Sequence, residues 1–408
     1  MIDKVRGGKR IVLGVQFLFV AFGATVLVPL LTGIDPAVAL FTAGIGTLVF
    51  HLITKGKVPI YLGSSFAFVA PIIKATELYG MPGAMCGIIA VGLVYAIFSM
   101  IIKFFGLGII HRLFPKIVVG PVIIIIGLSL SSTGVKMASS NWIVALSSLI
   151  TAVVVSIYVK GFFKLIPIFC GVIVGYLTSM FLGIIDYSAI SQASWIAFPH
   201  FVFPKWSFGA ITYMIPVAIA PMIEHIGDMY AISNVAHKDF IKDPGLHRTL
   251  LGDGVASTIA ACFGGPPNTT YSEVTGAVAL TRVVDPSIMR VSAIAALIFS
   301  LVGKISAFLT TIPESVLGGI MLMLFGLIAS VGIKNLVDER EKLEENRNQI
   351  IVAIILTVGI GGAVVKFRSF SMAGIGLASI VGVILNFVLP EKRDVLDIKV
   401  KSKVSKGN

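Results

Sequence analysis

The chain has 408 residues, of which 56% are hydrophobic and only 13% are charged, and its mean hydropathy is +0.99. This composition is too apolar for an ordinary soluble domain and indicates many membrane-spanning helices. The net charge of +12 does not indicate a nucleic-acid-binding protein. Cationic loops and a basic tail at 391–408, which can lie against anionic lipid headgroups, account for the excess.

A helix needs about 20 mainly apolar residues to cross a hydrocarbon core about 30 Å thick. On this criterion the sequence predicts an all-α polytopic membrane protein with about 14 transmembrane segments. In chain order they cover 11–32, 36–53, 58–76, 83–102, 115–133, 141–159, 164–184, 208–233, 246–263, 267–280, 287–307, 314–333, 349–366 and 370–389. The charged stretch 337–347 is expected to form a solvated loop or a short surface helix.

Basic residues collect in cytoplasmic loops, so their distribution predicts the orientation of the chain. With a cytoplasmic N-terminus, 26 of the 32 Lys and Arg residues fall on the cytoplasmic side. The others are Lys74, Lys136, Lys205, Lys304, Lys366 and Arg368. We therefore expect an even number of crossings of the cytoplasmic (inner) membrane, with both termini inside. The first apolar run lacks a small-residue cleavage site and is expected to remain as the first helix.

The two halves of the chain resemble each other. Residues 113–128 read LFPKIVVGPVIIIIGL and residues 311–327 read TIPESVLGGIMLMLFGL, an offset of about 199. With seven spans in each half, the second half enters the membrane from the opposite side. The sequence thus predicts a seven-plus-seven inverted repeat.

Spans 3 and 10 contain matching interruptions. VPIYLGSSFAF (58–68) and GPPNTTYSEVTG (265–276) each place Pro, hydroxyl, β-branched and aromatic residues before a helix-like stretch. We expect two short antiparallel strands here, each running into a half-helix. A broken backbone is tolerated in a membrane only where it lines a cavity or is buried in protein. Paired interruptions therefore indicate a binding site near the membrane midplane.

Three carboxylates lie in or beside these apolar helices. Glu224 and Asp228 are four residues apart and share one helix face, and a charge at mid-bilayer costs at least about 2.5–3.5 kcal/mol. Glu273 lies at the start of the half-helix in span 10, where free amides favour a negative charge. Each has a structural alternative: pairing or snorkelling for Glu224 and Asp228, and simple capping for Glu273.

The remaining polar residues give weaker signals. His225 points about 100° away from Glu224 and is expected to pack or hydrogen-bond rather than bind a ligand. Asp253 is assigned equally to the site and to structure, while Glu314 follows Pro313 at a helix start and is expected only to complement the helix dipole. Asn268, Thr269 and Thr270 are expected to satisfy the broken backbone rather than to bind substrate.

No metal site or enzyme motif is evident in the sequence. Glu224-His225 does not form a zinc-binding His-Glu-x-x-His pattern, and no other His completes one. Cys86, Cys170 and Cys262 lie in or beside apolar spans without metal-ligand spacing and are interpreted as small core residues. A membrane-embedded enzyme, an anion carrier of the same architecture and a passive channel are the alternatives to a proton-coupled carrier.

At five stretches the sequence resembles the nucleobase–ascorbate transporter family, and specifically its bacterial uracil permease branch. They are FGATVLVPLLTGIDPAVALF (22–41), GKVPIYLGSSFAF (56–68), IEHIG (223–227), KDPGLHR (242–248) and PPNTTYSE (266–273). The resemblance implies proton-coupled import of a nucleobase, no cofactor other than the coupling proton, and a homodimer built through gate domains. It also implies a core domain (1–112 and 208–310), a gate domain (113–207 and 311–390) and a cytoplasmic tail (391–408).

The resemblance also implies roles for individual residues. Glu224 and Glu273 match carboxylates that hydrogen-bond the base, and Phe66 and Ser272 match positions whose backbone amides meet its carbonyl groups. Tyr271 is assigned to the same site, and proton coupling to Glu224, Asp228 and Glu273.

One position departs from the uracil branch. Permeases of that branch usually read Glu-His-x-Gly-His in span 8, whereas this chain has Asp228 at the last position, as xanthine and purine carriers of the family more often do. The PNTTYSE segment resembles the uracil branch, in which Glu273 stands where purine carriers often have an amide. The prediction is therefore uracil, with xanthine or another base as the alternative.

Overall fold

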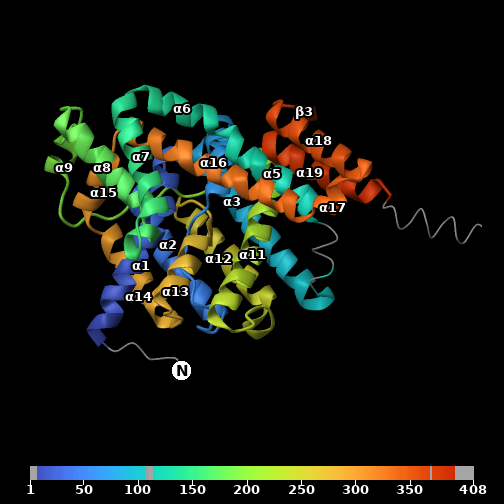
Figure 1. Cartoon of the computed structure of the whole chain (residues 1–408), viewed down its shortest axis with the longest axis horizontal. Coiled ribbons are helices and arrows are strands. Elements are labelled where there is room, and N and C mark those ends of the chain that lie inside the picture. The colour runs from blue at the N-terminus through green and yellow to red at the C-terminus, as the bar shows by residue number, and fades with distance from the viewer. Residues whose placement is uncertain (1–6, 107, 109–113, 368–369, 391–408) are drawn as a thin grey trace, which may run out of the picture.

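The computed structural model describes residues 7–106, 108, 114–367 and 370–390, and these form a mainly helical protein (Figure 1). The basic tail at 391–408 and the basic residues Lys4, Arg6, Arg112 and Arg368 lie outside the described residues. The N-terminal end of α1 and the start of α14 lie at the bottom of Figure 1, and α6 and β3 lie at the top.

The first helices follow the predicted spans closely. They are α1 (Gly7–Thr32) and α2 (Pro36–Ile53). Asp35 caps α2 by accepting a hydrogen bond from the Ala37 amide at 2.8 Å, and Pro36 occupies the first helical position, where no amide is needed. Next come β1 (Leu62–Ser64), the 3₁₀ turn η1 (Phe66–Phe68) and α3 (Val69–Phe105). Gly80, with φ of 72°, interrupts α3 and separates the two predicted spans within it.

The next elements complete the first half. They are α5 (Lys116–Ser129), α6 (Ser131–Ser139), α7 (Trp142–Tyr158), η2 (Phe162–Leu165), α8 (Pro167–Phe181) and α9 (Ser188–Gln192). The predicted span 115–133 therefore ends at Ser129, and a second helix follows at once.

The second half begins with α10 (Phe208–Met214), η3 (Ile215–Ala218) and α11 (Ile219–Ala236), which together cover the predicted span 208–233. It continues with η4 (Ile241–Gly245), α12 (Leu246–Cys262), β2 (Asn268–Thr270), α13 (Ser272–Thr281), α14 (Pro286–Ser300) and α15 (Gly303–Thr310). The last elements are α16 (Glu314–Asp338), α17 (Arg340–Leu343), α18 (Asn346–Ile360), β3 (Val364–Phe367), β4 (Phe370–Ala373) and α19 (Gly374–Val388).

Three predicted boundaries were wrong. The span 287–307 is two helices, because the chain leaves the helix after Ser300 and Val302 pairs with Ile196 in an isolated β-bridge. The spans 349–366 and 370–389 are shorter than predicted, because β3 and β4 form an antiparallel hairpin between α18 and α19. The short surface helix expected within 337–347 is present as α17.

The helices pack in two groups. In the first, α12 packs against α2 and α3, and α14 packs against α1 and α2. In the second, α16 packs against α5, α6 and α7, α8 packs against α7, and α18 packs against α5 and α19. Figure 1 shows α1, α2, α12 and α14 toward the bottom, and α6, α7, α8, α18 and α19 toward the top.

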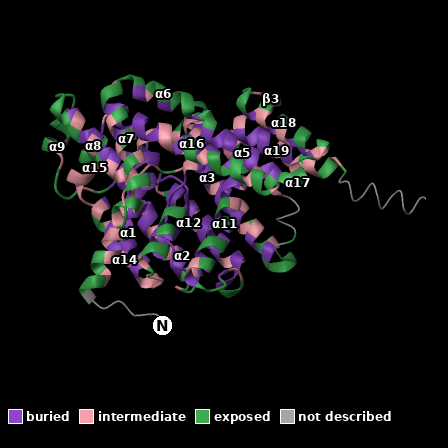
Figure 2. Cartoon of the chain, in the orientation of Figure 1, coloured by how far each residue is buried: buried purple, intermediate pink, exposed green. Residues whose placement is uncertain are grey.

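The surface of the helices is that of a membrane protein. By length and apolarity, six of the described helical segments can cross a membrane, and five shorter helices are also apolar. Large apolar side chains such as Leu93, Ile150 and Phe181 are exposed at 60%, 57% and 84%. Buried residues, coloured purple in Figure 2, are most frequent on helices inside the molecule. Lipid rather than water is the solvent that such a surface fits.

Candidate functional site

The two predicted strands are present and pair with each other. β1 and β2 are antiparallel, with Leu62 opposite Thr270, Gly63 opposite Thr269 and Ser64 opposite Asn268. All six residues are buried, so the interrupted backbone of spans 3 and 10 satisfies part of its own hydrogen bonding inside the protein.

Neighbouring helices satisfy other backbone groups of these strands. The Leu62 amide donates to the Thr47 hydroxyl at 2.9 Å, and the Ser257 hydroxyl donates to the Asn268 carbonyl at 2.9 Å. The Asn268 side-chain amide donates to the Thr42 carbonyl at 3.2 Å. The Asn268 side chain therefore joins β2 to α2 rather than satisfying the broken backbone that we expected it to serve, and the Thr269 hydroxyl has no hydrogen-bond partner among the described residues.

Each strand leads directly into a helix whose first residue was predicted to meet the substrate. Phe66 is the first residue of η1, and Ser272 is the first residue of α13. The first amides of a helix have no partner within that helix, so they remain available to an acceptor. Because the strands are antiparallel, the two helix starts follow opposite ends of the strand pair: Phe66 comes after Ser64, which lies opposite Asn268, and Ser272 comes after Thr270, which lies opposite Leu62.

Asp228 connects α11 to the broken span. Its two carboxylate oxygens accept hydrogen bonds from the Thr270 hydroxyl at 2.7 Å and from the Ser272 hydroxyl at 2.6 Å, and the residue is only 4% exposed. Thr270 therefore binds a carboxylate rather than the backbone that we expected it to satisfy. Asp228 holds the end of β2 and the start of α13 against α11.

Glu224 and Glu273 face open space. Both side chains are exposed, although His225 and Val274, their neighbours in the chain, are fully buried. One helical turn further along each helix, Gly227 and Gly276 also have free space beside them, because a Cβ added at either would meet no atom within 4 Å. Glu224 also interacts electrostatically with Asp228 and Glu273, so α11 and α13 bring the three predicted carboxylates together.

Tyr271 lies between these groups but points into the protein. It is 4% exposed, and its hydroxyl donates to the Ser64 carbonyl at 2.9 Å and lies 3.3 Å from the Thr25 hydroxyl. A Cβ added at Gly63 would lie 2.4 Å from the Tyr271 hydroxyl oxygen, so only glycine fits there. The side chain thus joins β1, β2 and α1.

A second buried polar group lies behind the carboxylates. His225 Nε2 lies 3.0 Å from the Thr249 hydroxyl, and Nδ1 lies 3.2 Å from Asp253 Oδ2. Both His225 and Asp253 are fully buried. The contact with Thr249 fits the prediction of a hydrogen-bonding histidine, and the contact with Asp253 is an ion-pair distance that places the Asp253 carboxylate next to α11. Sequence reasoning missed Thr249, although its spacing of four from Asp253 places both on one face of α12.

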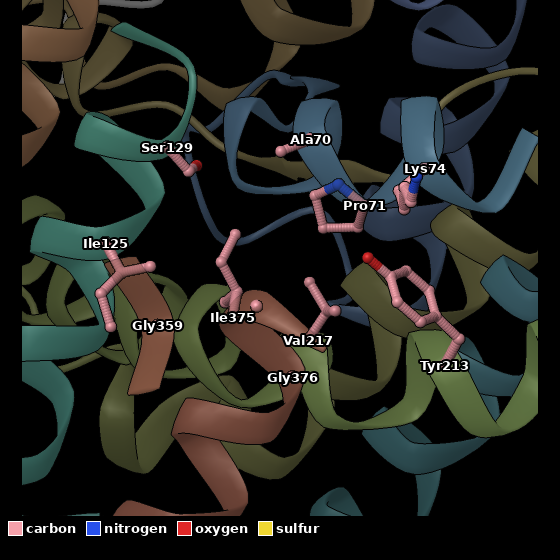
Figure 3. Close-up of a pocket in the computed structure, with 11 residues that line it drawn as sticks. Ala70, Pro71, Lys74, Ile125, Ser129, Tyr213, Val217, Gly359, Ile375 and Gly376 are labelled. Carbon is pink, nitrogen blue, oxygen red and sulfur yellow. The ribbon is translucent and has the colours of Figure 1, made fainter. Parts of the chain in front are cut away.

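Two cavities in the structure do not contain the carboxylates. One, of about 140 Å³, lies between α3, η3, α5 and α19 and is lined by Lys74 and Tyr213, among others (Figure 3). A smaller one, of about 10 Å³, is lined by apolar residues that include Met222 and Ile226. Among the described residues no group of His, Cys, Asp and Glu can hold a metal ion.

The sequence profile of a permease family named for xanthine and uracil permeases matches residues 8–367. The chain belongs to this permease family. It is 47% identical to a probable uracil permease of Pasteurella multocida, with 95% of each chain covered. It is also 44% identical to the uracil permease of Bacillus subtilis, with 93% of this chain and 92% of the relative covered.

The fold of this permease resembles that of a solved transporter. The murine anion transporter Slc26a9, solved in the inward-facing state, superposes with a TM-score of 0.70 over 95% of this chain and 69% of that chain, at 12% identity. At this identity the likeness concerns the fold alone. The chain is therefore a multi-pass membrane permease that acts on a small-molecule substrate, and it is not an enzyme.

Proposed function

We propose that this permease imports uracil together with protons by alternating access. The observation that carries the proposal is the position of Glu224 and Glu273, one on each of two adjacent helices, facing open space beside the paired strands. Curated relatives at 38–47% identity over most of the chain are uracil permeases or probable uracil permeases, which supports the choice of base.

The chemistry of the site suits a neutral planar base. Uracil carries N–H donors and carbonyl acceptors along its edge, so carboxylates accept from the former and free backbone amides donate to the latter. In the proposed complex, Glu224 and Glu273 accept hydrogen bonds from the base. The amides of Phe66 and Ser272 donate to its carbonyl oxygens, and Tyr271 keeps the two strands in place around it.

The proposed proton coupling rests on the three carboxylates that lie near one another. Glu224, Asp228 and Glu273 are near enough to interact, and like charges at such distances are costly away from bulk water. Uptake of a proton by this group lowers that cost. A site that takes up one proton with each base therefore couples the entry of base to the proton gradient.

We propose 14 spans in a seven-plus-seven inverted repeat in the inner membrane, with both termini cytoplasmic. The ion pairs outside the predicted spans support this topology, because among the described residues each such pair that joins distant segments links residues predicted on the same side. The predicted cytoplasmic pairs are Lys57–Asp243, Lys116–Asp338 and Arg10–Asp285. On the predicted outer side His200 lies 3.4 Å from Asp35. The side-by-side strands from spans 3 and 10 also fit a repeat that places matching breaks together.

We assign the two packing groups to the proposed core domain (1–112 and 208–310) and gate domain (113–207 and 311–390). All residues of the carboxylate site belong to the core segments, so rocking of the core against the gate would expose the site to each side in turn. A homodimer built through the gate domains is part of the same proposal. Its test is the mass of the purified protein in nanodiscs.

Xanthine is the second candidate substrate. Asp228, in place of the histidine usual in the uracil branch, is the observation that favours it. Because the Asp228 carboxylate already accepts from Thr270 and Ser272, it shapes the site through α13 and its direct contact with a base is limited. The larger ring system of xanthine would have to fit over Gly227 and Gly276, where no side chain intrudes.

The test is uptake of labelled uracil into proteoliposomes, with and without an inward proton gradient. Unlabelled uracil, xanthine, thymine, guanine and chloride are the competitors, and the Glu224→Gln/Glu273→Gln variant is the control for uptake through the site. We expect uracil to compete best and the gradient to drive accumulation. Stronger competition by xanthine selects the second candidate, and absence of competition by every base overturns the proposal. Uptake that is the same with and without the proton gradient indicates a passive channel.

A further inference from the structure

The 140 Å³ cavity lies along the line that leads outward from the carboxylate site. Ala70 and Lys74 follow Phe66 by one and two helical turns, and both line the cavity. Val217 and Tyr213 precede Glu224 by about two and three turns and line it from the other helix. Because Lys74 is predicted on the outer side, the cavity lies between the site and the outer face.

The cavity also lies between the two packing groups. Pro71 on α3 belongs to the first group, Val217 lies on η3 between α3 and α19, and Ser129 on α5 and Ile375 on α19 belong to the second group. Its volume is roughly ten times the minimum that holds one ordered water. It therefore has room for a small ring compound, and apolar side chains on both sides can lie against the faces of such a ring.

Two hydrogen-bond donors of the cavity, the Lys74 ammonium and the Tyr213 hydroxyl, lie near each other on one side, while the Ser129 hydroxyl on the other side already donates to the Ile126 carbonyl at 3.1 Å. Figure 3 shows the Tyr213 hydroxyl directed toward the region of Pro71 and Lys74. Within the described part of the chain the Tyr213 hydroxyl makes no hydrogen bond, and the Lys74 ammonium uses one of its three donors on Glu77 at 2.8 Å. This ion pair leaves the wall without net charge, so a neutral ligand with carbonyl oxygens fits it better than an anion does.

We infer that this cavity is a second, outer binding site for the same class of ligand, a neutral planar base, which it holds by the carbonyl edge. Lys74 and Tyr213 donate to the carbonyl oxygens, whereas Glu224 and Glu273 accept from the N–H groups. The two sites thus bind complementary groups of one molecule, its carbonyl oxygens and its N–H groups. A base arriving from outside binds here first and then passes along α3 and α11 to the carboxylates. The inference rests on the proposed function, because it takes the substrate class from there.

The experiment is saturation-transfer NMR with millimolar uracil on purified protein in nanodiscs. Four proteins are compared: wild type, Glu224→Gln/Glu273→Gln, the same variant with Lys74→Met and Tyr213→Phe, and the same variant with Lys136→Met. The first pair of substitutions removes binding at the carboxylates. Lys136 is an exposed lysine on α6 that does not line the cavity, so its substitution is the matched control.

We expect saturation of the uracil ring protons to persist in Glu224→Gln/Glu273→Gln and in its Lys136→Met derivative. It should fall at least fivefold when Lys74→Met and Tyr213→Phe are added, with an unchanged melting temperature. Loss of all signal in Glu224→Gln/Glu273→Gln, or a signal that ignores the added substitutions, overturns the outer site while leaving the proposed function intact. If wild type itself binds no base, the proposed function fails and the outer site fails with it.

Discussion

Asp228→Asn tests whether the join between α11 and the broken span supports substrate binding. The carboxylate accepts two hydrogen bonds, at 2.7 and 2.6 Å, and at 4% exposure water cannot replace them. Asparagine keeps one accepting oxygen without a charge, and its NH₂ group cannot accept the second hydroxyl proton. Because hydrogen bonds to charged groups contribute about 1.5–3 kcal/mol each, we expect the join to weaken by roughly that amount.

This loss corresponds to a factor of roughly 10–150 in an equilibrium constant. Ser272, which we place at the substrate, is one of the two residues that Asp228 holds, so the affinity for uracil should fall by up to this factor. The assay is equilibrium binding of labelled uracil to purified protein. Asp239→Asn is the control, because Asp239 accepts from the Lys242 amide in an exposed turn. Binding by Asp228→Asn within twofold of wild type would refute the reasoning.

Three further substitutions address the other polar groups. Glu273→Gln should lower uracil affinity by about 10–150-fold, because one oxygen that accepts from the base is replaced by a donor, whereas Glu314→Gln at the start of α16 should leave binding unchanged in the same assay. Asp228→His should lower the affinity for uracil as Asp228→Asn does, because a neutral imidazole accepts only one of the two hydroxyl protons, and it should shift the pH dependence of uptake within about pH 5–8, where imidazole changes its charge; a pH dependence like that of wild type would indicate that Asp228 has only a structural role. His225→Ala should lower the melting temperature by leaving Asp253 buried without its partner, and a wild-type melting curve would show that the contact contributes no stability.

The carboxylates and the strands could be predicted because both break a strong local pattern. A carboxylate within an apolar run, such as Glu224, and a Pro-rich interruption before Glu273 are costly in a membrane unless they have a function. The antiparallel pairing was expected from the predicted inverted repeat, because such a repeat would bring the two breaks together. A carboxylate or a break within an apolar run, and the likeness of two distant segments, can each be recognised in the sequence alone.

Other features depend on contacts between distant segments and were missed. Apolar residues continue through 287–307, so composition does not reveal that α14 ends at Ser300, where Val302 instead pairs with Ile196. The bonds from Thr270 and Ser272 to Asp228 likewise depend on how α11 packs against α13. The β3–β4 hairpin was not predicted from the sequence, because β-branched and aromatic residues are compatible with both a strand and an apolar helix end.

During synthesis β1 is completed long before β2, the strand with which it pairs. Leu62 and Thr270 are about 200 residues apart, and at roughly 5–20 residues per second the ribosome needs about 10–40 s between them. During that interval β1 is in or near the membrane without the strand that completes its hydrogen bonds. The unpaired backbone groups of β1 must therefore be shielded from lipid by α1, α2 or the insertion machinery until the second half of the permease supplies β2.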